Sequence, residues 1–269
     1  MVLPIVVRSR GCKHPPRRSV PIPALDCTSA RMAEVTEAAR LAVSLLLRPD
    51  TGLLRIIGLS LGVSLAAAAV ATLVGLPFGA VLGVYPFPGR RGLVLLANAL
   101  LGLPPVVVGL ALYLLLSRAG PFGGLGLLFT PSAMIAAQAL LALPIVTALG
   151  HRAAAAAWGR YGDEFLALGL TRLQAMPHLF RISRDECLTA ALAGFGRSVS
   201  EVGAILIVGG NIAGYTRTMT TAITLETAQG HLAYAMALGL VLIAISLAVS
   251  GAAFLLSGRT RASQTRGGR

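Results

Sequence analysis

The sequence predicts an all-α, polytopic membrane protein with five transmembrane helices, and three observations support this. Only 12% of the 269 residues are charged, against about 25% in an average soluble domain. The mean hydropathy is +0.78, so a soluble fold would expose too much apolar surface. Five apolar runs each reach the ~20 residues that cross a bilayer core, and an isolated span must be helical to satisfy its own backbone hydrogen bonds.

The N-terminal stretch, residues 1–31, differs in composition from the rest of the chain. It contains five prolines and six basic residues, without helical periodicity or an apolar run long enough for a signal peptide. We expect it to be a disordered tail, and we expect the native chain to begin at or near Met32. Residues 32–53 then read as an amphipathic helix.

The transmembrane domain is expected to cover residues 54–257, followed by a basic cytoplasmic tail, residues 258–269. Prolines occur in three of its five apolar runs, at Pro77, at Pro104 with Pro105, and at Pro144. This frequency suggests helices bent around a path. The five runs are Leu54–Val84, Leu93–Leu116, Leu127–Leu149, Leu188–Ala213 and Leu232–Leu256.

The distribution of arginines sets the expected orientation. The first loop has Arg90 and Arg91, the third loop (150–187) has five arginines and the tail has four, whereas the second and fourth loops have only Arg118 and Arg217. The positive-inside rule therefore puts the C-terminus in the cytoplasm and the N-terminus outside, although residues 1–31 are themselves basic. Because the basic residues flank apolar runs, the net charge of +13 indicates a membrane and not nucleic acid.

The third loop shows a pattern of its own. Asp163 and Glu164 precede a short apolar stretch that ends at Gly169, and apolar residues then resume at helical spacing from Leu173 to Phe180. This predicts a short amphipathic helix, a glycine turn and a second amphipathic helix. A helical hairpin lying on the membrane surface is the alternative.

This loop resembles the cytoplasmic signature of ABC importer permeases, which has the form Glu-Ala-Ala, three residues, Gly. Asp163 matches the acidic position and Gly169 the glycine, while Glu164 and Phe165 replace the two alanines. Further stretches, LANALLGLPPVVVGLALYLLLSRAGPFGGLG and RSVSEVGAILIVGGNIAGYTRTMTTAITLETAQG, are similar to the permease subunit of tungstate-type ABC importers. The resemblance covers about residues 33–257. Molybdate and sulfate permeases share part of the second stretch and stay open as alternatives.

The resemblance implies an inner-membrane permease that forms a homodimer in membrane lipid. Two ABC ATPase subunits would hydrolyse ATP, and an extracytoplasmic protein would deliver the oxyanion. The loop would hold the coupling helix, with Asp163, Glu164, Ala167 and Gly169 at the ATPase contact. The chain has no GxxxxGK[ST] motif, so we expect no nucleotide or other cofactor bound by this chain and no enzyme activity of its own. Its three cysteines lack metal-ligand spacing, so no metal site is expected.

The fourth run carries two opposite charges, Arg197 and Glu201, four residues apart. On a helix they would share a face and pair, and pairing matters because one charge at mid-bilayer costs ~2.5–3.5 kcal/mol. The pair is either a structural ion pair or part of an anion path. Further candidate path residues, expected to donate hydrogen bonds near Arg197 or at the outer mouth, are Ser200, Asn211, Thr216, Arg217 and Thr218.

Two other function classes fit the composition less well. An ion-coupled secondary transporter usually needs several intramembrane acids and often an internal repeat, whereas this chain offers one such acid, Glu201, and no visible repeat. A membrane-embedded enzyme needs a catalytic constellation within the spans, and no histidine lies mid-span.

Overall fold

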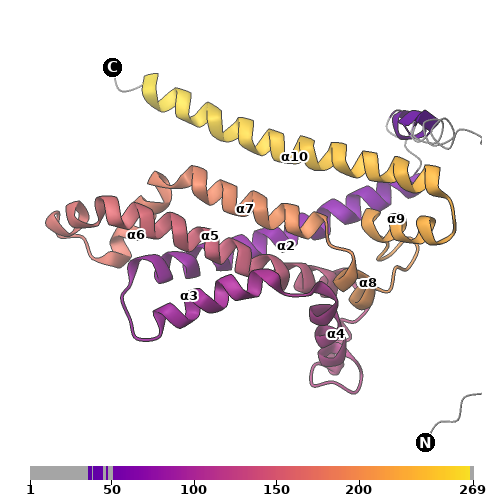
Figure 1. Cartoon of the computed structure of the whole chain (residues 1–269), viewed down its shortest axis with the longest axis horizontal. Coiled ribbons are helices and arrows are strands. Elements are labelled where there is room, and N and C mark those ends of the chain that lie inside the picture. Colours follow the sequence, from indigo (N-terminus) through magenta and orange to yellow (C-terminus); the bar gives the residue numbers. More distant parts are fainter. Residues whose placement is uncertain (1–35, 38, 45–46, 48–50, 267–269) are drawn as a thin grey trace, which may run out of the picture.

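The computed structural model describes residues 36–37, 39–44, 47 and 51–266, with side chains as far as Leu255, and all its elements are helices (Figure 1). The expected N-terminal tail, residues 1–31, lies outside the described residues. In chain order the elements are α2 (Thr51–Val84), α3 (Arg90–Ala99), η1 (Leu100–Gly102), α4 (Pro105–Leu116), η2 (Gly123–Leu125), α5 (Pro131–Ala167), α6 (Arg172–Ile182), α7 (Arg184–Val199), α8 (Gly203–Gly209), α9 (Met219–Ala228) and α10 (Leu232–Arg266).

The expected amphipathic helix over 32–53 is described only in part. The described residues between 36 and 47 are helical, and Thr51–Leu53 already belong to α2. Ala42 is buried against Met219 of α9 and Val241 of α10, whereas Leu47 is 76% exposed. One face of this segment therefore packs on the end of the molecule that carries α9.

Three helices, α2, α5 and α10, are long and apolar enough to cross a membrane without a break. The other two predicted spans are bent pairs: α3 with η1 and α4 meet at 101°, and α7 and α8 meet at 60°. The expected five spans are therefore reached only if each bent pair counts as one. Each of the runs Leu93–Leu116 and Leu188–Ala213, expected to be helical, is thus divided by a bend.

The break between η1 and α4 follows from the two consecutive prolines. A proline clashes with an α-helical residue before it, so Pro104 keeps Leu103 extended and Pro105 keeps Pro104 extended, with ψ of 124° and 120°. Pro105 then starts α4, where its missing N–H costs nothing. Pro77 and Pro144, in contrast, lie inside unbroken helices.

The helix α2 packs along α5, and α7 lies against both (Figure 1). The contact depends on Gly75, Gly79 and Gly83, which occupy every fourth position of α2 and are buried. An added Cβ at Gly79 would lie 2.6 Å from the carbonyl oxygen of Thr147. Small residues at this spacing let two helix backbones approach closely.

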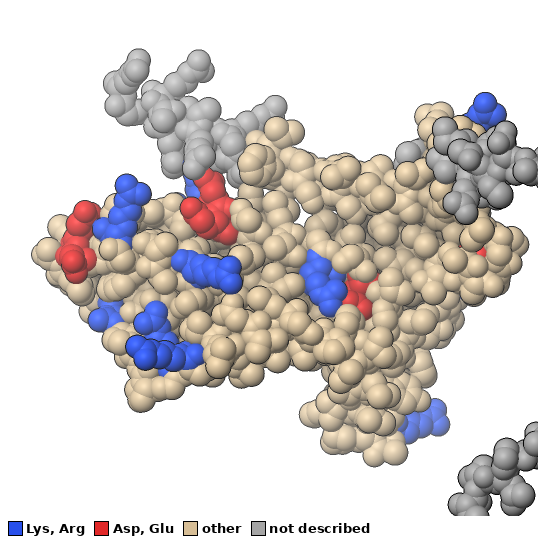
Figure 2. Space-filling model, in the orientation of Figure 1, with Lys and Arg blue, Asp and Glu red and all other residues tan. Residues whose placement is uncertain are grey.

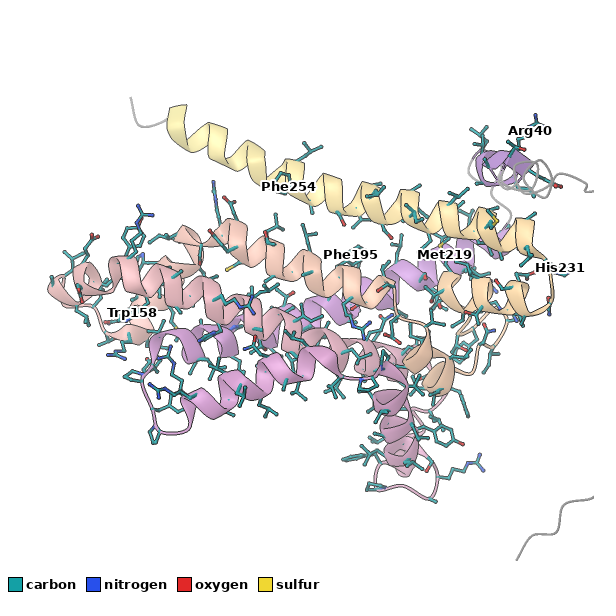
Figure 3. All side chains as sticks on the ribbon, viewed as in Figure 1. Arg40, Trp158, Phe195, Met219, His231 and Phe254 are labelled. Carbon is teal, nitrogen blue, oxygen red and sulfur yellow. The ribbon has the colours of Figure 1, made fainter. Side chains whose placement is uncertain are left out.

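The cytoplasmic loop expected over residues 150–187 is mostly helix. The predicted first amphipathic helix is the last part of α5, which runs without interruption to Ala167. The alanine-rich stretch 153–157 favours helix, and Ala154 and Ala157 pack against Ala80 and Val84 of α2. Only the predicted second helix is separate, as α6. Figure 3 shows Trp158 at this α6 end of the molecule and Met219 toward the opposite, α9 end.

Candidate functional site

The break between α7 and α8 is built around Glu201. Its side chain is 3% exposed, and its Oε2 lies 3.2 Å from Nη1 of Arg197. Its Oε1 accepts a hydrogen bond from the backbone N–H of Ala204 at 3.1 Å. Its carbonyl oxygen accepts one from the hydroxyl of Thr220, also at 3.1 Å. These bonds give partners to the carboxylate and to the backbone carbonyl of Glu201, at the point where the helical hydrogen bonds of α7 end.

The predicted pairing of Arg197 with Glu201 is present, but the two residues do not share a helix. The helix α7 ends at Val199, and Glu201 lies in the break after it. Arg197 is 28% exposed, so the buried member of the pair is the acid and the accessible member is the base. Ser200 is exposed and its hydroxyl donates to the carbonyl oxygen of Arg197 at 3.1 Å. The pair therefore presents positive charge on its open side.

Gln138 of α5 contacts the last turn of α7, just before this break. It is 2% exposed, and its Nε2 donates to the carbonyl oxygen of Ser198 at 2.8 Å. Its Oε1 is buried without a hydrogen-bond partner among the described residues. The sequence shows Gln138 only as a polar residue in an apolar run, and nothing there tells which backbone atom it would meet.

The segment between α8 and α9 holds the other candidate path residues, and two of them differ from expectation. Thr216 is fully buried, donates to the carbonyl oxygen of Gly209 at 2.5 Å and accepts from the N–H of Ile212. Thr218 is 2% exposed and forms the capping box of α9. Their hydroxyls therefore fold the segment and do not face an outer mouth. Arg217 is half-buried, and its Nε donates to Oδ1 of Asn211 at 3.3 Å.

The four residues expected at the coupling contact lie together at the α6 end. Asp163, Glu164, Ala167 and Gly169 are all exposed around the turn that joins α5 to α6. Gly169 has φ of +76°, a left-handed conformation that glycine adopts without steric cost. The same tip exposes apolar side chains, with Leu168 76% and Leu173 67% exposed. An exposed apolar patch edged by acids is typical of a protein contact.

Two arginines connect this tip to the membrane helices, and in the sequence they serve only as topology signals. Arg172, the first residue of α6, donates to the carbonyl oxygen of Val84 at 2.9 Å, and its guanidinium lies over Trp158 at 5.6 Å. Arg90 donates to the carbonyl oxygens of Leu82 and Gly83 at 2.5 and 3.2 Å. Cations on the last carbonyls of a helix satisfy unpaired acceptors and complement its dipole. Arg172 therefore ties the first turn of α6 to the end of α2.

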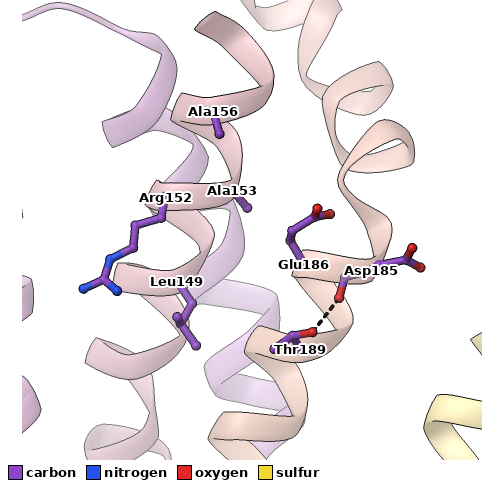
Figure 4. A pocket seen from close by; sticks show the side chains of 7 residues that line it. All are labelled: Leu149, Arg152, Ala153, Ala156, Asp185, Glu186 and Thr189. Carbon is purple, nitrogen blue, oxygen red and sulfur yellow. Dashed lines mark hydrogen bonds between the residues drawn. The ribbon is translucent and has the colours of Figure 1, made fainter. Parts of the chain in front are cut away.

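A cavity of about 410 Å³ lies between α5 and α7, on the α6 side of the break (Figure 4). Arg152 of α5 and the acidic pair Asp185 and Glu186 of α7 line it. Arg152 also donates to Oδ1 of Asn98 at 3.1 Å. The lining carries both signs of charge, so this cavity has no clear preference for an anion. Among the described residues, no three histidine, cysteine or acidic side chains come close enough to hold a metal ion.

Charges are unevenly distributed on the surface. Figure 2 shows most blue and red side chains at the α6 end, while the middle of this face is tan except for one adjoining blue and red pair. An apolar belt with charges at its end is the pattern of a membrane protein that projects into water on that side.

No protein family model matches the chain. Individual relatives do. A protein of Haloferax volcanii named "Probable anion ABC transporter permease protein" is 40% identical over 222 residues, 81% of this chain and 96% of the relative. The tungstate uptake system permease protein TupB of Peptoclostridium acidaminophilum is 38% identical over 84% of this chain and 99% of its own length. TupB of Campylobacter jejuni is 40% identical over 62% of this chain and 70% of its own length. With its apolar helices and this similarity along almost the whole length of two relatives, the chain is a multi-pass membrane protein and belongs to the family of ABC transporter permeases.

Proposed function

We propose that this chain is the membrane subunit of an ABC importer for tungstate. The observation that carries the proposal is the 38% identity over 99% of the tungstate uptake permease of Peptoclostridium acidaminophilum. Molybdate or sulfate is the alternative, and the relatives named for those ions are more distant. Two copies of the chain form the path, an extracytoplasmic protein delivers the anion, and two ATPase subunits bind and hydrolyse the ATP. The chain itself has neither a cofactor nor catalytic activity.

The exposed tip of α5 and α6 is the ATPase contact in this proposal. Asp163 and Glu164 give it charge, Leu168 and Leu173 give it apolar area, and Gly169 fixes the turn. The bond from Arg172 to Val84 carries its movement into α2. This assignment puts the α6 end in the cytoplasm and the α9 end outside, in agreement with the arginine count of the loops.

The Arg197–Glu201 pair is the central element of the anion path. Arg197 offers its guanidinium to a tetrahedral oxyanion, a geometry that planar guanidinium donors match well. Glu201, 3.2 Å from Arg197, competes for the same donors and keeps the anion from binding too tightly to leave. Asn211 and Arg217 lie further toward the α9 end and extend the polar lining.

The test is uptake into proteoliposomes that contain the permease, its ATPase and its binding protein. ATP-dependent uptake of tungstate in preference to molybdate and sulfate is the expected result. A preference for molybdate or sulfate would replace the substrate, and uptake driven by an ion gradient without ATP would remove the ABC importer assignment.

The double variant Arg197→Met with Glu201→Leu separates the two interpretations of the pair. If the pair lines the path, the double variant assembles and stimulates ATP hydrolysis as the wild type does, yet carries little anion. Wild-type uptake by the double variant would show that the pair is only structural. Arg197→Met alone is the reference for loss of stability. It leaves the buried Glu201 without its partner, which lowers the free energy of unfolding by roughly 3–5 kcal/mol for a buried pair.

A further inference from the structure

A second cavity lies at the α9 end of the molecule, away from the Arg197–Glu201 pair. It has a volume of about 320 Å³. Two segments that are far apart in sequence line it, the first turns of α2 and the loop that joins α8 to α9. The lining residues are Thr51, Gly52, Arg55, Ile56, Leu59, Ala213, Gly214 and Arg217.

This cavity brings together two arginines, Arg55 from α2 and Arg217 from the loop. None of its described lining residues is acidic, and the first turn of α2 contains no acid. Asp50 precedes that turn in the sequence and lies outside the described residues. Two guanidinium groups without an acid in the described lining make this cavity positively charged, and such a charge attracts an anion.

The guanidinium groups of both arginines keep donors available. Arg55 makes no hydrogen bond or ion pair with any other described residue, and its Nη1 would lie 3.5 Å from a Cβ added at Gly214. Gly214 has φ of +74°, and the turn it allows brings the loop against Arg55. Arg217 uses Nε toward Asn211 at 3.3 Å, which orients the group and leaves its two terminal nitrogens without a protein acceptor among the described residues.

Two other cavities of the described residues lack this character. The cavity between α5 and α7 includes Asp185 and Glu186, which repel an anion. The cavity among α2, α7 and α10 is apolar, apart from Thr72. Of these three cavities, only the one at Arg55 and Arg217 has basic side chains and no acidic residue in its described lining.

The arginine cavity is also linked to the break that holds Glu201. Three residues after Arg217, the hydroxyl of Thr220 donates to the carbonyl oxygen of Glu201 at 3.1 Å. The N–H of Met219 donates to the hydroxyl of Ser60 on α2, one turn and a residue after Arg55. Residues 217–220 thus join the loop of Arg217 both to α2, which carries Arg55, and to Glu201, the partner of Arg197.

We propose that Arg55 and Arg217 form an anion-loading site, which holds a tetrahedral divalent oxyanion by hydrogen bonds from both guanidinium groups before it reaches Arg197. This inference rests on the proposed function for the identity of the anion. Two guanidinium groups and a doubly charged oxyanion balance in charge, and several N–H donors match four oxygen atoms. A monovalent anion would leave one positive charge without a partner.

The experiment measures equilibrium binding of tungstate to the permease–ATPase complex in phosphatidylcholine nanodiscs, without binding protein and without ATP. Arg55→Gln and Arg217→Gln are each expected to weaken binding about 10- to 100-fold, the loss that removal of a charge-assisted hydrogen bond produces. Arg118→Gln is the matched control, because Arg118 is an exposed arginine of another loop, and it should bind as the wild type does. Unchanged binding in both cavity variants would overturn the proposal.

Two further arms identify the source of the oxyanion. Binding should be the same in nanodiscs that contain phosphatidylglycerol, whereas competition by this lipid would assign the cavity to a lipid phosphate group. The affinity for the binding protein should also be unchanged in both variants, and its loss with intact tungstate binding would make the cavity a docking point instead. This experiment measures binding only, so its result is compared with uptake in the proteoliposomes. A wild-type complex that binds tungstate in nanodiscs but does not import it in proteoliposomes contradicts the proposed function alone. One that imports it while both variants bind normally contradicts the loading site alone.

Discussion

Substitution of Gly79 by alanine tests whether the packing of α2 on α5 determines the stability of the subunit. The sequence contains three GxxxG motifs in α2, Gly58 with Gly62, Gly75 with Gly79 and Gly79 with Gly83, and it does not distinguish them. In the structure, a Cβ added at Gly62 meets no atom within 4 Å, whereas one added at Gly79 lies 2.6 Å from the carbonyl oxygen of Thr147 and 2.7 Å from the backbone nitrogen of His151. Both neighbours are backbone atoms, so no side chain can rotate away.

The size of the effect follows from these distances. Ordinary van der Waals contact begins at 3.4 Å, so the helices must separate by 3.4 − 2.6 = 0.8 Å near Gly79. A gap of 0.5–1 Å removes roughly a quarter to a half of the dispersion energy of the contacts affected. Overpacking of this kind typically costs about 1–3 kcal/mol, which lowers the unfolding temperature by roughly 2–12 °C in a chain of this size.

The assay is thermal unfolding of the purified permease in detergent, followed by the loss of the monodisperse peak in size-exclusion chromatography. Gly62→Ala is the matched control, because both substitutions gain the same helix propensity, about 1 kcal/mol per Gly→Ala exchange. We expect Gly79→Ala to unfold at a lower temperature than Gly62→Ala. Equal unfolding temperatures would refute the argument that backbone contact at Gly79 holds the two helices together.

Three more predictions concern coupling and orientation. Gly169→Val forces a β-branched residue to φ of +76°, at a cost of at least about 1–2 kcal/mol, and should uncouple ATP hydrolysis from uptake. The control Gly159→Val, in a helix with open space around the new side chain, should leave coupling intact, and normal uptake by Gly169→Val would contradict the coupling role. Arg172→Gln removes the bond to the end of α2 and should lower the number of anions transported per ATP hydrolysed. The control is Arg181→Gln, at an exposed position of the same helix, and equal transport-to-ATP ratios in the two variants would contradict a mechanical link. A reporter fused after the last residue should be active in the cytoplasm, and activity on the other side would reverse the orientation.

The sequence by itself determined the properties that depend on neighbouring residues. Apolar runs of sufficient length predict membrane helices, because a span must satisfy its own backbone hydrogen bonds whatever surrounds it. The turn at Gly169 is equally local, since glycine reaches a left-handed φ without help from tertiary contacts. The pairing of Arg197 with Glu201 was also predictable, because four residues separate them and neither charge is tolerated alone in an apolar environment.

Only the tertiary structure decided where the runs break and which residues from distant segments meet. In the break after α7, the hydroxyl of Thr220 donates to the carbonyl oxygen of Glu201, across 19 positions, and no local propensity encodes such a bond. The burial of Thr216 was hidden for the same reason, since its hydroxyl donates to the carbonyl oxygen of Gly209, a contact that hydropathy cannot reveal. Whether a GxxxG motif packs, and whether Arg55 lies beside Arg217, depends on the position of a second helix or loop in space. A sequence pattern sets what each segment can form, while the packing of the segments selects which contacts are made.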